Sequence, residues 1–169
     1  MKRIILWGFA IFISATNSFA QEADSLQLES LCTRVDSLSR RLDQLQCDYD
    51  YFKCEYDLTL LQNELELFCQ QTKNNSQDLI IDSYHNKLDI DFYITCKKMY
   101  DNSVEWLNVM KEKSIRIQDK IDHTVLVSNF SDKQNEQLKE LNSLVKSAFS
   151  IAESALNLYK ASLDFYKEH

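Results

Sequence analysis

Apolar residues recur at alternating steps of three and four along residues 26–68, a stretch with no glycine and no proline. This seven-residue spacing is typical of a helix face that packs on another helix. The first seam consists of Leu28, Leu31, Val35, Leu38, Leu42, Leu45, Tyr49, Phe52 and Tyr56. A second apolar face consists of Cys47, Tyr51, Cys54, Leu58, Leu61, Leu65 and Phe68. The pattern predicts one long helix with two packing faces.

Polar stretches divide the rest of the chain into two further helices. Residues 73–76 (Lys-Asn-Asn-Ser) form the first break, because asparagine tolerates left-handed backbone and Ser76 can cap the next helix. Residues 122–131 form the second break, and Ser131 followed three residues later by Gln134 has the spacing of a capping box. The pattern predicts helices at about 24–72, 77–121 and 132–167.

Composition favours the same interpretation. The chain has no proline and a single glycine, Gly8, whereas strands joined by tight turns need such residues. We therefore expect an all-α fold, an elongated antiparallel three-helix bundle or coiled coil. Small residues in the third helix are expected to allow a close approach to Trp106 and Met99; they are Ala148, Ala152 and Ala155.

The first 20 residues have the pattern of a secretory signal peptide. Lys2 and Arg3 precede an apolar run over residues 4–13, and small residues stand at 18 and 20. The alternative is an uncleaved membrane anchor, but the run is shorter than the roughly 20 residues that a bilayer span needs. We expect a mature chain of residues 21–169 that forms a single helical domain, is periplasmic or secreted, and has no transmembrane span.

Charge argues against nucleic acid as a partner. The full chain has 19 basic and 26 acidic residues. Removal of Lys2 and Arg3 leaves 17 basic residues, so the formal charge of the mature chain is 17 − 26 = −9. A protein this acidic is repelled by phosphate backbones.

The five cysteines suggest a disulfide, because exported proteins usually meet an oxidising compartment. A turn near Asn75 would set Cys54 opposite Cys96, and facing positions on close helices can bring two Cα atoms within disulfide range. The alternative is that the cysteines are buried, reduced thiols that pack as small apolar residues. Cys32, near the first seam, is the candidate for a bond between two copies.

Signals for chemistry are weak. Asp78, Asp82, His85 and Asp89 share one face at helical spacing, and Asp82 with His85 is the weak candidate for a metal site. A solvated polar face explains the same residues. No cofactor is expected, because Cys-x-x-Cys, His-Glu-x-x-His and Gly-x-Ser-x-Gly motifs are absent. An aromatic group could line a ligand groove, although core packing is its commoner role; it comprises Tyr49, Tyr51, Phe52, Tyr56, Tyr93, Tyr100 and Trp106.

The sequence predicts an exported, non-enzymatic helical protein that acts by protein–protein contact in a structural, adaptor or chaperone-like role. The expected interaction seam is Leu28, Leu31, Val35, Leu38, Leu42 and Leu45. Either the far ends of the second and third helices cover this seam, or a second chain covers it in a dimer or trimer. The alternative function is a helical bundle that binds a metal ion or a small apolar ligand.

Overall fold

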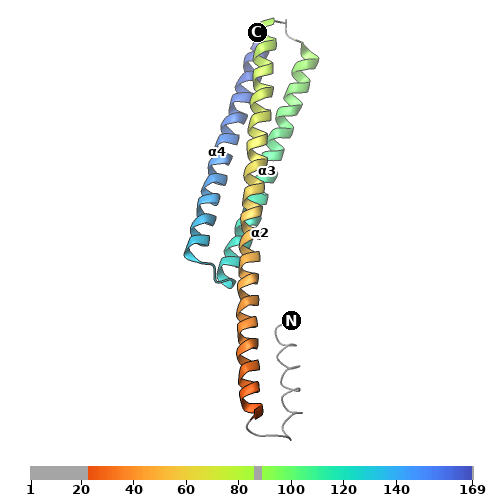
Figure 1. The fold of residues 1–169 in the computed structure, drawn as a ribbon. Helices are drawn as coiled ribbons and strands as arrows, with labels where there is room; N and C mark the ends of the chain where they lie inside the picture. The colour runs from red at the N-terminus through yellow and green to blue at the C-terminus, as the bar shows by residue number, and fades with distance from the viewer. Residues whose placement is uncertain (1–22, 86–88, 169) are drawn as a thin grey trace. The chain divides into compact units, whose positions relative to one another are not determined.

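The computed structural model describes residues 23–85 and 89–168, which form three helices (Figure 1). Helix α2 spans Ala23–His85, α3 spans Ile90–Val127 and α4 spans Asp132–Glu168. The described residues contain no strand. The predicted all-α, three-helix fold is therefore confirmed. The predicted signal peptide, residues 1–20, lies outside the described residues and stays a prediction.

The chain divides into two compact units, Met1–Leu45 and Gln46–His169. The described part of the first unit is the helical segment 23–45 of α2. In the second unit, the remainder of α2 packs with α3 and α4.

Hydrogen bonds and ion pairs give the directions of the helices in the second unit. Partners on α2 and α3 are 63 residues apart at Asp57 and Lys120 but 49 apart at Glu64 and Lys113, so these helices are antiparallel. Partners on α2 and α4 keep a nearly constant separation, 86 residues at Ser76 and Ser162 and 84 residues at Asp82 and Tyr166, so these two helices are parallel. The unit is an up-down-up three-helix bundle, as predicted.

The predicted first break at residues 73–76 is wrong, because α2 continues through it to His85. The polar run contains no glycine or proline that would stop a helix, and its Ser76 has a partner in the bundle. Thr72 and Ser76 are buried, and the Ser76 hydroxyl lies 2.6 Å from the Ser162 hydroxyl of α4. Consequently α3 begins at Ile90 rather than near residue 77. Asp89 caps it, since its carboxylate accepts hydrogen bonds from the backbone N–H groups of Asp91 and Phe92.

The second break was predicted better. Helix α3 extends to Val127, six residues beyond the expected end, and α4 begins at Asp132 as predicted. The capping box is present: Gln134 donates its backbone N–H to the Ser131 hydroxyl oxygen at 3.3 Å, and its side chain accepts the Ser131 N–H at 2.9 Å.

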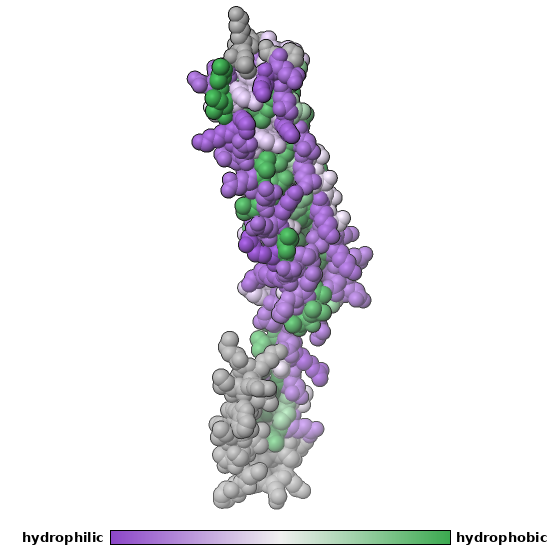
Figure 2. All heavy atoms as spheres, turned by 180° about the vertical axis from the view of Figure 1, so that it is seen from behind, coloured by the Kyte–Doolittle hydropathy of each residue, from purple (hydrophilic) through white to green (hydrophobic). Residues whose placement is uncertain are grey.

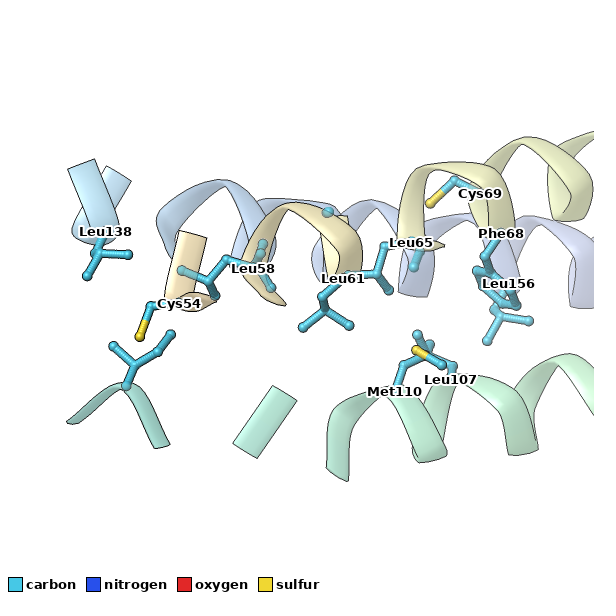
Figure 3. Packing of buried hydrophobic residues seen from close by; sticks show 14 of the residues in the cluster. Cys54, Leu58, Leu61, Leu65, Phe68, Cys69, Leu107, Met110, Leu138 and Leu156 are labelled. Carbon is cyan, nitrogen blue, oxygen red and sulfur yellow. The ribbon is translucent and has the colours of Figure 1, made fainter. Parts of the chain in front are cut away.

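Two clusters of buried side chains hold the bundle together. The first contains most of the predicted second face of α2, and Figure 3 shows Leu61 on the side facing Leu107 and Met110 of α3. Phe68 stacks on Trp106 of α3 with ring centroids 4.6 Å apart. The second cluster consists of Leu79, Cys96, Tyr159, Leu163 and Tyr166. Since all seven residues of that second face are buried, this prediction is confirmed.

Alanines on α4 are buried, as their small size suggested. Ala148 and Ala152 lie in the first cluster, against which Trp106 packs. Met99 is 41% exposed, and the expected approach of these alanines to it stays a prediction.

Candidate interaction surface

The first seam is exposed along its whole length. The exposed fractions range from 38% at Val35 to 66% at Leu45. The three aromatic residues that continue it, Tyr49, Phe52 and Tyr56, are 61–65% exposed. No described residue buries these nine side chains. The six aliphatic positions predicted as an interaction seam are therefore available to a partner.

The seam and the buried face lie on opposite sides of α2 where both occur. Exposed Tyr56 and buried Leu58 are two residues apart, which corresponds to about 200° around a helix. Exposed Tyr49 and buried Tyr51 have the same relationship. A partner on the seam would thus bind α2 without displacing the bundle core.

The seam has a defined end. Beyond Tyr56 the same heptad positions are occupied by Thr59, Asn63, Glu66 and Gln70, all polar. Within the second unit, hydrophobic patches (green) stand among hydrophilic residues (purple) on the face that Figure 2 shows. The seam on α2 therefore ends at Tyr56, and the other exposed apolar residues of the second unit are not part of it.

Charged residues border one side of the seam, at the positions immediately before Val35, Leu42, Tyr49 and Tyr56. These positions hold Arg34, Arg41, Asp48 and Glu55. The opposite border holds Cys32, Ser39, Gln46 and Lys53. The sequence-based site prediction did not include these charges, although their seven-residue spacing is visible in the sequence. Their sign changes from basic to acidic midway along the seam.

The predicted Cys54–Cys96 disulfide is wrong. All five cysteines are free, and Cys54 and Cys96 belong to different core clusters. Because α2 continues to His85 and α3 begins only at Ile90, the end of α3 near Thr124 and Lys120 faces Cys54. Burial raises the pKa of both thiols. Cys47, Cys54, Cys69 and Cys96 are buried, as in the alternative interpretation of small apolar residues.

Cys32 is the one exposed cysteine of the chain. Its predicted bond to a second molecule is untested by the structure and stays a prediction.

Two of the four residues considered for metal binding, Asp82 and Asp89, have other contacts. The Asp82 carboxylate accepts a hydrogen bond from the Tyr166 hydroxyl at 2.9 Å, and Asp89 caps α3. The side chain of His85 is outside the described part of the structure. Within that part, no group of three or more His, Cys, Asp or Glu side chains is arranged to hold a metal ion.

The aromatic group does not form one groove. Tyr49, Phe52 and Tyr56 are on the seam, whereas Trp106 stacks on Phe68 in the first cluster. Two other members pack on tyrosines of α4: Tyr93 on Tyr166 and Tyr100 on Tyr159.

Tyr159 has the most perturbed environment among these tyrosines. It is fully buried, its hydroxyl donates a hydrogen bond to the backbone carbonyl of Cys96 at 3.0 Å, and burial raises its pKa to about 12. Because the pKa is raised in the folded protein, the unfolded chain loses the Tyr159 proton at a lower pH than the folded chain does. The contribution of the neutral tyrosine to stability is therefore complete below pH 10 and is lost as the pH rises from 10 toward 12.

We expect Tyr159→Phe to remove this part of the pH dependence and to cost about 1 kcal/mol of unfolding free energy at pH 7, since one hydrogen bond is lost. Urea unfolding of both proteins at pH 7, 10 and 11.5 is the measurement. The difference between them should shrink with increasing pH. A difference that is constant across this range would contradict the assignment.

The fold and the surface define an all-α three-helix bundle protein with an exposed apolar helix face. No family model matches the chain, and neither a curated protein nor a solved structure shows significant similarity to it. Among the described residues, no helix combines the length and apolarity that a membrane crossing requires.

Proposed function

We propose that this protein is a non-enzymatic helical protein that acts by protein–protein contact through the first seam of α2. The observation that carries the proposal is the exposure of nine apolar side chains on one helix face. Each exposes on the order of 100 Å², and monomeric proteins seldom expose a contiguous apolar patch larger than a few hundred Å². Burial of this stripe would stabilise a complex by removing apolar surface from water.

The sequence supports an exported setting for this contact. Residues 1–20 have the charge and hydropathy pattern of a signal peptide, which favours a periplasmic or secreted structural, adaptor or chaperone-like component. The formal charge of −7 for the full chain favours a protein partner over nucleic acid.

The test is a double substitution in the middle of the seam, Leu38→Glu with Leu42→Glu, in the full chain. Cells that express it are cross-linked with formaldehyde, and covalent adducts of the protein are quantified on gels. We expect roughly tenfold less adduct than for the wild type, because carboxylates would have to be buried at the contact. Circular dichroism should show an unchanged helical fold, since both leucines are more than 60% exposed.

A matched control carries two glutamates at exposed apolar positions outside the seam, Ile115→Glu with Leu126→Glu. Ile115 is 62% exposed, as Leu38 is, so the control changes charge and hydropathy to a similar extent. It should keep the wild-type adducts. Equal adduct yields from the wild type and the seam variant would contradict the proposed function.

A further inference from the structure

We propose that the partner on the first seam is a second copy of this chain, whose α2 packs antiparallel with Leu42 of one copy opposite Leu45 of the other. This inference rests on the proposed function and specifies its partner. Two-fold symmetry then pairs each residue from Leu31 to Tyr56 with the one equally far from the midpoint between Leu42 and Leu45, on its other side. The pairs can be written down from the heptad spacing alone.

Charge complementarity is the first argument. In this register Arg41 of one copy lies beside Asp48 of the other, and Arg34 lies beside Glu55. Each pair occurs twice, so the four charged residues of this border each lie beside an opposite charge of the second copy, while Asp48 also accepts a hydrogen bond from Gln134 of its own α4. Such pairs select partner and orientation in coiled coils.

A parallel pairing would use the same charges poorly. In a parallel pair, each residue of one border faces the residue of the opposite border whose number is five higher. Arg34 and Arg41 would therefore lie beside Ser39 and Gln46 of the second copy. Asp48 with Lys53 would be the one opposite-charge pair. The distribution of charge therefore favours the antiparallel arrangement.

Side-chain size is the second argument. In the antiparallel register each aromatic residue of the seam faces an aliphatic one. The opposed pairs are Tyr56 with Leu31, Phe52 with Val35, and Tyr49 with Leu38. A parallel register would instead place Tyr49 and Tyr56 against their own copies. Alternation of large and small residues across facing positions allows the layers to interdigitate.

The area is sufficient for a stable dimer. The eight seam side chains from Leu31 to Tyr56 together expose roughly 800 Å² per copy, which is about the area per partner of a standard specific interface. The exposed side chains alone thus provide a typical interface without a rearrangement of the bundle.

This arrangement changes the expectation for Cys32. In the antiparallel register Cys32 lies near Lys53 of the second copy, and the two Cys32 residues are about 35 Å apart along the helix axis. A disulfide requires two Cα atoms within about 7 Å. A Cys32–Cys32 bond is therefore incompatible with this dimer.

The experiment reverses the charge of one member of the Arg34–Glu55 pair at a time. The dimerisation of the full-chain variants is measured by sedimentation equilibrium. Arg34→Glu alone and Glu55→Lys alone each bring like charges together twice in a homodimer. We expect each to weaken the dimer roughly tenfold. An equimolar mixture of the two variants should recover the wild-type dissociation constant, because both pairs in the mixed dimer again carry opposite charges. Circular dichroism checks that each variant is folded.

Arg40→Glu is the matched control, since it makes the same charge change on the face of α2 away from the seam. It should leave the dissociation constant unchanged. A dimer unaffected by Arg34→Glu, or one that oxidation links through Cys32, would overturn the antiparallel register. A wild-type protein that stays monomeric while its seam-dependent adducts contain a different protein would overturn the second-copy partner and leave the proposed function intact. Adducts that do not depend on the seam would overturn both.

Discussion

Leu61→Ala is expected to lower the free energy of unfolding by about 2–5 kcal/mol, the range for truncation of a buried leucine. Leu61 is fully buried in the first core cluster, on the side of α2 that faces Leu107 and Met110 (Figure 3). The substitution removes three buried carbons, so the favourable free energy of their transfer out of water is lost. It also leaves a cavity that the packed helices can close only in part. Urea unfolding followed by circular dichroism measures the effect.

Leu67→Ala is the control, since it makes the same chemical change on the same helix. Leu67 is 57% exposed, so its truncation should alter the unfolding free energy by no more than about 0.5 kcal/mol. If the two variants lose equal stability, Leu61 is not in the core that the structure describes. If neither loses stability, the bundle is not the folded unit.

The local sequence predicts two kinds of feature well: those with a pattern that repeats over several heptads, and those in which two nearby residues bond to each other. The buried face of α2 repeats over several heptads, from Cys47 to Phe68, and each of these positions supports the same prediction. The start of α4 depends on two residues that satisfy each other, Ser131 and Gln134. Both features need only neighbours in the sequence.

The first turn could not be predicted in this way. Residues 73–76 are polar, and in a chain whose one glycine is Gly8 and which has no proline, a polar run is the local feature that predicts a break. Ser76 instead bonds to Ser162, which is 86 residues away in the sequence. A local sequence pattern cannot indicate a hydrogen-bond partner that is so distant in the sequence. The error in the turn then shifted the register, which is why Cys54 and Cys96 were paired wrongly.

The candidate surface, too, was only partly predictable from the local sequence. The heptad spacing identified the seam residues, but two alternatives, coverage by the other helices or by a second chain, were equally consistent with it. The choice between the two alternatives required the positions of the side chains in space, which leave the seam residues exposed. The bordering charges became informative only when the seam was known to be exposed, because charges beside a buried seam would have been part of the bundle.

Ala152→Leu is expected to destabilise the bundle by about 1–3 kcal/mol through overpacking. Ala152 is fully buried in the first cluster, where a small residue lets α4 approach its neighbours closely. A leucine there must displace packed side chains or separate the helices. Helix propensity does not confuse the result, since leucine is nearly as good a helix former as alanine. Thermal and urea unfolding both report the change.

Ala161→Leu tests whether space, rather than the leucine itself, causes that loss. Ala161 is on the same helix but exposed, so the added carbons extend into water. The unfolding free energy should change by no more than about 0.5 kcal/mol. If Ala152→Leu is tolerated equally well, α4 does not lie close to its neighbours at Ala152. A large loss at Ala152 alone would instead support the close approach, because only close helices make a buried alanine necessary.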